Sequence, residues 1–241
     1  HIRVKDQVLV DGLQEQGQPP LHWARAGREV SPREWHTLLN NSGSSSGSAD
    51  NDINNSGSLV LDCRNSYESK VGTFIGSVPL DTDTFKDTWG ALRKKLRGVS
   101  KDTPLLTYCT GGIRCVKVNA YLMQRMGYTN VGRLQGGIVS YAREMVHHDD
   151  IGGSGLSGLG AGADADDVEA DVTVGADTRL HFKSKFVGVN YTFDQRMGTR
   201  ITDDIIAKCG TCGTACDTYS NCQALHCHKR LIQCPACASR Y

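Results

Sequence analysis

Hydrophobic and polar positions in the middle of the chain alternate between short apolar runs and longer amphipathic stretches. The apolar runs lie at residues 59–61, 104–108 and 131–134, and their length favours buried strands. Between them, the spacing of apolar side chains predicts helices over residues 83–97 and 113–126. Strands that alternate with helices form a parallel sheet covered on both faces, so we expect an α/β fold with a doubly wound sheet.

Two segments of strongly polar composition interrupt this pattern. Residues 40–58 consist mainly of Asn, Ser, Gly and Asp, and residues 149–178 hold eight acidic side chains and no basic one. Neither segment can bury enough apolar surface to offset the entropy of ordering, so we expect a flexible insertion and a flexible linker. We expect a leading segment at residues 1–30 and an α/β domain with its insertion at 31–148. An acidic linker at 149–178 and a small Cys-rich module at 179–241 would follow.

Composition narrows the class of protein. Of the 241 residues, 39% are hydrophobic, enough for one well-buried domain and a smaller module, and no apolar run approaches the roughly 18 residues of a membrane-spanning helix. The net charge of +1 hides a basic C-terminal module, in which nine Lys or Arg face four Asp. Seven of the ten cysteines lie within residues 209–237, where their spacing suits a metal better than disulfides, so we expect an intracellular reducing compartment.

The residue with the clearest chemical signal is Cys109, which follows the predicted strand at residues 104–108. Gly111 and Gly112 let the backbone turn, and the predicted helix begins at once with Ile113. Backbone N–H groups at such a turn and at a helix N-terminus favour an anion, so we expect a catalytic thiolate with a pKa below the usual value of about 8.5. The alternative is a buried structural thiol at a plain strand-to-helix turn.

Other side chains of this loop support the same interpretation. Thr110 completes the loop, and Arg114 either adds positive charge or braces the backbone. The spacing from Cys109 to Arg114 is one residue shorter than in Cys-dependent phosphatases of similar design, which disfavours a phosphatase. Cys115 either acts as a resolving thiol for Cys109 or packs in the helix.

Polar residues after the first predicted strand form a second group. Asp62 is expected to anchor the loop through hydrogen bonds. Arg64 and Glu68 are spaced to pair with each other or to bind a substrate anion, and structural pairing is the role we expect. Further along, Gly136 and Gly137 follow the third strand, where they need serve only close packing.

The Cys-rich module contains two Cys-x2-Cys pairs separated by twenty-one residues. Four thiolates so spaced can converge on a tetrahedral structural zinc ion. The expected ligands are Cys209, Cys212, Cys234 and Cys237. A second and weaker metal site would use Cys216, Cys222 and Cys227. Disulfides, packed reduced thiols and, for an oxygen-using reaction, an iron–sulfur cluster are the alternatives.

Several stretches of the chain resemble the rhodanese-like superfamily. They include Leu-Asp-Cys-Arg-Asn at 61–65 and the segment at 108–115 that surrounds Cys109. Together with Phe-Asp-Gln-Arg-Met-Gly at 193–198 and the Cys-rich tail, they look like the bacterial tRNA uridine 5-hydroxylase family and its eukaryotic rhodanese-like relatives. The two polar insertions depart from the bacterial pattern and favour a eukaryotic member.

The resemblance implies a tRNA-modifying oxidoreductase. In that family a cysteine at the position of Cys109 is essential. The implied reaction converts wobble uridine in tRNA to 5-hydroxyuridine, with molecular oxygen as co-substrate. The family also has a preceding ferredoxin-like domain, of which residues 1–10 would be the last strand. The basic charge of the C-terminal module, with Tyr191, Phe193 and Tyr219 interleaved, suits contact with phosphates and an unstacked base of tRNA.

Two other functions are compatible with the same residues. In a sulfurtransferase, the Cys109 thiolate would accept a sulfane sulfur from thiosulfate or a persulfide donor and pass the sulfur to a nucleophile. Alternatively, the chain could keep the fold as a non-catalytic interaction or assembly module. Formation of 5-hydroxyuridine in tRNA, transfer of sulfur from thiosulfate, or neither activity distinguishes the three functions.

Overall fold

The computed structural model describes residues 9–13, 19–42, 57–145, 183–192, 198–222, 226–227 and 230–240. Most of the predicted insertion at 40–58 and the whole predicted linker at 149–178 lie outside these residues. The same holds for most of the strand expected at 1–10 and of the motif at 193–198.

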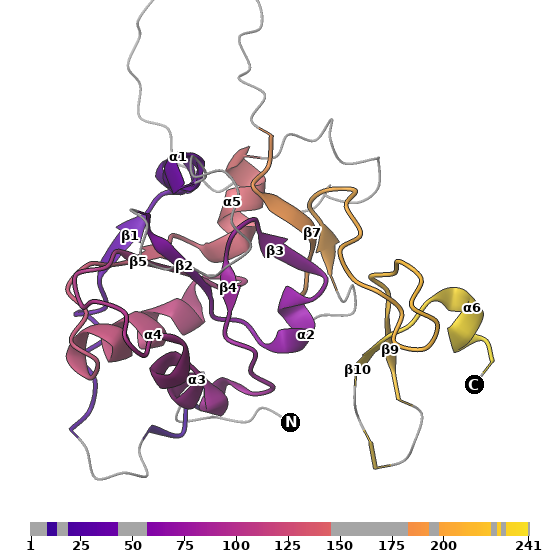
Figure 1. Cartoon of the computed structure of the whole chain (residues 1–241), viewed down its shortest axis with the longest axis horizontal. Coiled ribbons are helices and arrows are strands. Elements are labelled where there is room, and N and C mark those ends of the chain that lie inside the picture. The colour runs from indigo at the N-terminus through magenta and orange to yellow at the C-terminus, as the bar shows by residue number, and fades with distance from the viewer. Residues whose placement is uncertain are drawn as a thin grey trace, which may run out of the picture.

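A parallel five-stranded sheet organises the α/β domain (Figure 1). Its strand order is β1-β6-β5-β2-β4, and every pairing is parallel. The three predicted apolar runs are confirmed as β2, β5 and β6, which are the inner strands and are apolar because both of their faces are buried. The strands are β1 (Arg28–Val30), β2 (Leu59–Asp62), β4 (Val78–Pro79), β5 (Leu105–Tyr108) and β6 (Val131–Leu134).

Helices cover both faces of this sheet, which confirms the doubly wound fold. Successive strand residues point to opposite faces, so Leu61 and Leu105 pack in one core cluster and Val60 and Leu106 in the other. The first face is covered by α3 and α4, and the second by α1 and α5 (Figure 1). These helices are α1 (Pro32–Ser42), α3 (Thr88–Lys95), α4 (Ile113–Gln124) and α5 (Gly137–Met145).

The two predicted helices are both present, but one is shorter than expected. A 3-10 turn at Phe85–Asp87 precedes α3 within the predicted range 83–97. The carboxylate of Asp87 accepts hydrogen bonds from the backbone N–H and the hydroxyl of Thr84, at 3.0 and 2.8 Å. This reciprocal cap tightens the first turn, so the α-helix proper starts only at Thr88.

The described residues before position 31 belong to the α/β domain and not to a preceding one. β1 forms an edge of the sheet by pairing with β6. The indole N–H of Trp89 donates to the carbonyl oxygen of Asp11 at 2.7 Å, and Leu21 packs in the core beneath α3 and α4. The predicted domain boundary at residue 31 is therefore too late along the chain.

A small antiparallel sheet attaches the C-terminal module to the α/β domain. Its strand order is β3-β7-β8, and Phe186 at the start of β7 is fully buried against the core that includes Trp35. The strands are β3 (Gly72–Phe74), β7 (Phe186–Asn190) and β8 (Thr199–Arg200). Because β3 comes from the α/β domain and both β7 and β8 come from the module, the first strand of the module packs as part of the domain.

The other strands and helices described in the module are a short hairpin and one helical turn. The hairpin pairs β9 (Tyr219–Asn221) with β10 (Arg230–Ile232), and α6 (Pro235–Ala238) follows it. In the domain, α2 (Ser66–Ser69) lies on the side that faces this module (Figure 1). None of the helices in the described part of the chain is both long and apolar enough to cross a membrane.

Candidate functional site

Cys109 directly follows the inner strand β5, and α4 begins after three further loop residues. The N–H group of Gly112 donates to the Cys109 sulfur at 3.2 Å. Gly112 does so from a left-handed conformation with a φ of 85°, which favours glycine. The structure thus places the thiol where the sequence predicts it, at the carboxyl edge of the sheet, where α/β folds bind ligands.

Arg114 braces this loop through a buried ion pair with Glu68 of α2. The guanidinium donates to both carboxylate oxygens, at 2.6 and 2.8 Å. The hydroxyl of Thr110 also donates to Glu68, at 3.0 Å, and accepts from Arg114 at 3.1 Å. Of the two roles predicted for Arg114, these bonds favour the brace, because the guanidinium is committed to protein groups and its side chain is only 10% exposed.

The pairing predicted between Arg64 and Glu68 is wrong. Arg64 instead pairs with Asp62, at 2.9 and 2.6 Å, and donates to the carbonyl oxygen of Gly72 at 2.6 Å. The hydroxyl of Tyr108 donates to the same carboxylate at 2.8 Å. Both charged side chains are fully buried, so this network fixes the ends of β2 and β5 and leaves no charge open to a substrate anion.

The turn between β6 and α5 supports the loop more directly than its predicted packing role suggests. The N–H groups of Ile138 and Val139 donate to the carbonyl oxygens of Cys109 and Thr110, both at 3.1 Å. A Cβ atom on Gly137 would overlap the carbonyl oxygen of Cys109. Sequence reasoning missed this role, although two glycines at the carboxyl end of the strand next to β5 were a usable signal.

The predicted lowering of the Cys109 pKa is wrong for this structure. A hydrogen bond with the thiol of Cys115 and burial together raise the pKa of Cys109 well above its usual value, and the nearby charge of Arg114 does not compensate. Burial also raises the pKa of Cys115, whose thiol hydrogen-bonds to both Cys109 and Cys63. These surroundings favour the protonated thiol of Cys109 in the resting site.

This protonation state predicts an unusual pH profile for alkylation of Cys109. Because the thiolate is the nucleophile, the rate with iodoacetamide should keep rising above the pH at which free cysteine levels off. The Cys115→Ala variant removes the hydrogen bond that most raises the pKa, so its profile should shift to lower pH. Peptide mass spectrometry measures both profiles, and a Cys109 that is fully reactive at neutral pH would contradict the assignment.

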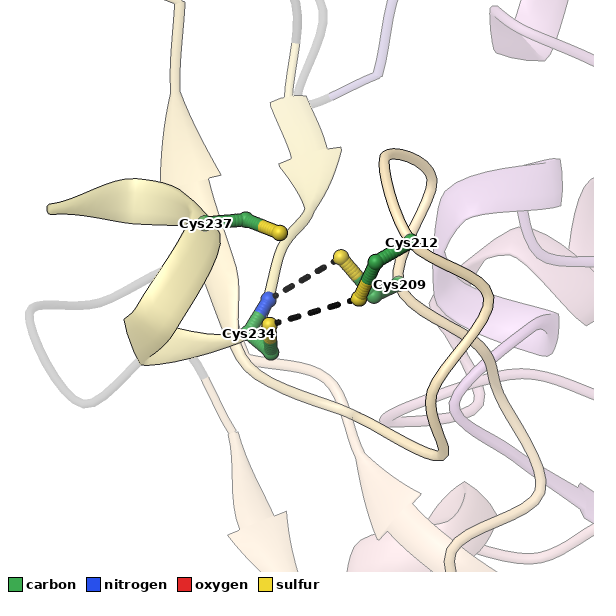
Figure 2. Close-up of side chains that lie close together, drawn as sticks. All are labelled: Cys209, Cys212, Cys234 and Cys237. Carbon is green, nitrogen blue, oxygen red and sulfur yellow. Dashed lines mark hydrogen bonds between the residues drawn. The ribbon is translucent and has the colours of Figure 1, made fainter. Parts of the chain in front are cut away.

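The four cysteines predicted to bind metal come together at the end of the C-terminal module (Figure 2). Their sulfur atoms all lie within 4.8 Å of one another. Cys212 and Cys234 are 3.7 Å apart, and the N–H group of Cys234 donates to the Cys209 sulfur at 3.3 Å. Tetrahedral sulfur ligands about 2.3 Å from a zinc ion stand about 3.8 Å apart, so the cluster could hold such a metal.

Proton sharing within the cluster also fits a cation site. Backbone N–H groups, first that of Cys234 and then that of Cys212, lower the pKa of Cys209 to about 6. Hydrogen bonds with the Cys212 and Cys234 thiols raise the pKa of Cys237 to about 12. One sulfur thus tends to be anionic and another protonated, and a bound cation would replace the shared protons.

The second metal site predicted from Cys216, Cys222 and Cys227 is not assembled. Within the described residues, the four-cysteine cluster is the one group of three or more potential ligands that lie close together. Cys216 packs against Cys209 and Cys237 as a buried apolar side chain. All ten cysteines carry free thiols, so the disulfide alternative is not realised.

Two family models match the chain. Residues 45–144 match the rhodanese-like domain, and residues 187–241 match the family described as rhodanase C-terminal. The first range contains β2 to most of α5 with the Cys109 loop, and the second contains the four-cysteine cluster. The matched ranges thus separate the two sites described above.

Curated relatives match the whole chain. Over 240 residues, the chain is 32% identical to a protein of Photorhabdus laumondii and 30% identical to one of Pectobacterium carotovorum, both named tRNA uridine(34) hydroxylase. These matches cover 100% of the chain and 54% and 53% of the relatives. The chain therefore spans about half the length of the curated relatives it matches. Both relatives are bacterial, so they give no support to the expected eukaryotic origin.

Among solved structures, a thiosulfate sulfurtransferase from Pseudomonas aeruginosa is 17% identical, with a TM-score of 0.36 over 50% of this chain and 19% of that one. The parallel sheet, the cysteine loop after β5 and the two matched family models agree with one another. The chain therefore contains a rhodanese-like domain followed by a region that matches the rhodanase C-terminal family.

Proposed function

We propose that this protein hydroxylates wobble uridine in tRNA to 5-hydroxyuridine, with Cys109 as the essential thiolate and molecular oxygen as co-substrate. The observation that carries the proposal is the match along the whole chain to relatives named tRNA uridine(34) hydroxylase. All ten cysteines are free of disulfides, which fits a reducing intracellular compartment, and this compartment is part of the proposal.

The site residues have separate tasks in this proposal. Cys109 is the one reactive group of the loop, and the N–H group of Gly112 is aimed at its sulfur, where the donor would stabilise a developing thiolate. Glu68 and Arg114 hold the loop in shape, so that this donor stays in place when the target base enters. Burial of the thiol excludes water, which protects a reactive sulfur species from hydrolysis.

The test is nucleoside mass spectrometry on tRNA from cells that lack wobble-uridine hydroxylation and are supplied with this protein. We expect 5-hydroxyuridine to return. If 5-hydroxyuridine stays absent while the purified protein transfers sulfur from thiosulfate to cyanide, the protein is a sulfurtransferase that uses a Cys109 persulfide. If neither activity is found, the fold serves as an interaction module.

We further propose that Cys209, Cys212, Cys234 and Cys237 bind one structural zinc ion. The end of the module has little apolar material to hold it, since its core cluster consists of cysteines and Ile232. A metal that joins the turn at Cys209 to the start of α6 would supply the missing stabilisation, as structural zinc does in other small modules.

Zinc analysis of the purified protein should give about one equivalent per chain. The Cys234→Ser variant removes a ligand and should lose the metal, because three thiolates bind zinc far less tightly than four. Cys222→Ser is the matched control, since Cys222 lies outside the cluster, and this variant should keep the zinc. A protein without metal and with seven reactive thiols in the tail would reject the site.

A further inference from the structure

A cavity of about 510 Å³ lies between α2 of the rhodanese-like domain and the C-terminal region. Its walls combine cationic side chains with tyrosine rings and aliphatic groups. Among the described residues that line it, none is acidic. The lining residues that matter here are Tyr67, Lys70, Lys208, Tyr219, Arg230 and Leu231.

The cationic groups enter the cavity from three separate parts of the chain. Lys70 follows α2, Lys208 precedes the four-cysteine cluster, and Arg230 begins β10. All three side chains are exposed to solvent. Three positive charges that converge without a lining carboxylate form an anion-binding surface, and their spread suits a chain of phosphates better than one small anion.

Aromatic rings form the floor beneath these charges. The Arg230 guanidinium lies 5.1 Å from the ring centroids of both Tyr67 and Tyr191. Tyr191 packs edge-on against Tyr67 and Tyr219, at 5.3 and 5.2 Å, and the Tyr219 hydroxyl donates to the main-chain oxygen of Tyr67. Tyr191 and Tyr219 are buried, so the flat surface that an unstacked base can reach is the exposed Arg230 guanidinium beside the half-buried ring of Tyr67.

The cavity is mechanically linked to the reactive loop through α2. Within this single helical turn, Glu68 points inward and pairs with Arg114 of the loop. Its neighbour Tyr67 lines the cavity instead, as does Lys70 at the end of the turn. Figure 1 shows α2 between the parallel sheet and the hairpin of β9 and β10. A ligand in the cavity would therefore lie against the element that holds the Cys109 loop.

We propose that this cavity binds a nucleotide of the substrate RNA, with the base against the tyrosine and guanidinium surface and the phosphates at Lys70, Lys208 and Arg230. The inference rests on the proposed function and adds to it a binding site distinct from the Cys109 loop. It also explains why the C-terminal region packs against α2: the two together complete a surface that neither forms alone.

The test measures the affinity of the purified protein for tRNA at several salt concentrations. Lys70→Glu and Lys208→Glu each reverse one exposed cavity charge and should weaken binding by tenfold or more. Each variant should also flatten the dependence of log Kd on log salt, by about 0.7 per lost phosphate contact on single-stranded RNA. Lys94→Glu on α3 is the matched control, because Lys94 is exposed but does not line the cavity.

Several outcomes would overturn the cavity assignment. If Lys70→Glu and Lys208→Glu bind tRNA with the same affinity and salt dependence as Lys94→Glu, RNA does not bind in the cavity. If an acidic peptide displaces tRNA as effectively as RNA does, the ligand of the cavity is a protein. Zinc content of Lys208→Glu verifies that the adjacent cluster is intact. The proposed function fails separately, if cells supplied with the unaltered protein form no 5-hydroxyuridine although the protein binds tRNA.

Discussion

Replacement of Cys109 by serine is expected to abolish formation of 5-hydroxyuridine while leaving the fold intact. The side chain sits in the loop as an acceptor from the N–H group of Gly112, a role that a hydroxyl can also fill. A serine hydroxyl, however, does not ionise near neutral pH and cannot take up a sulfur or oxidised-sulfur state. Nucleoside mass spectrometry on complemented cells measures the loss, and thermal unfolding of the purified variant verifies the fold.

Cys115→Ser is the matched control for this experiment. Cys115 is equally buried and hydrogen-bonds to Cys109, but it lies within α4 and not in the loop. We expect it to reduce activity only mildly. Activity of Cys109→Ser close to that of the unaltered protein would remove Cys109 from the reaction. If Cys115→Ser is as damaging as Cys109→Ser, the two thiols act together as a redox pair.

The elements of the domain could be predicted from the sequence because their signals are local. The apolar runs that became β2, β5 and β6 are short and buried on both faces, and the pattern after Cys109 is amphipathic over the length of α4. The position of Cys109 at a strand end follows from these two neighbours alone. The spacing of the two Cys-x2-Cys pairs likewise predicts that the four sulfur atoms lie close together, as they do in the structure.

The partners of charged side chains could not be predicted in the same way. Arg64 lies two residues from Asp62 and four from Glu68, so spacing allows either pair. The choice depends on Arg114, which is 46 residues from Glu68 in sequence and reaches it only once β2 and β5 are paired. Arg114 forms the ion pair with Glu68. Arg64 therefore pairs with Asp62 and donates a hydrogen bond to the carbonyl oxygen of Gly72.

The protonation of Cys109 is a second property that depends on the folded state. The sequence predicts that backbone N–H donors and a helix N-terminus surround the Cys109 sulfur, which would favour a thiolate. In the structure, the sulfur faces the thiol of Cys115 in a dry core, and these surroundings outweigh the donor from Gly112. Burial depth and the direction of the first helical side chains decide the balance, and neither is encoded in the motif.

The ion pair between Glu68 and Arg114 should be essential for both stability and activity. Glu68→Gln preserves the shape of the side chain but removes the negative charge that compensates a guanidinium whose side chain is only 10% exposed. Breaking a buried pair in this way typically costs about 3–5 kcal/mol of unfolding free energy. We expect a loss of this size in denaturant unfolding, and a fall in 5-hydroxyuridine formation because Thr110 and Arg114 no longer hold the loop.

Comparison with Glu29→Gln shows how much of the effect of Glu68→Gln is due to burial of the ion pair and not to loss of a charge alone. Glu29 pairs with Arg133 through one contact of 2.9 Å, and the Glu29 side chain is 51% exposed. Water screens such a pair, so its loss should cost at most about 1 kcal/mol and leave activity unchanged. If Glu68→Gln is no more damaging than Glu29→Gln, the buried pair is not what holds the loop. The hydrogen bonds from the Gly136–Gly137 turn to the Cys109 and Thr110 backbone would then have to hold it instead.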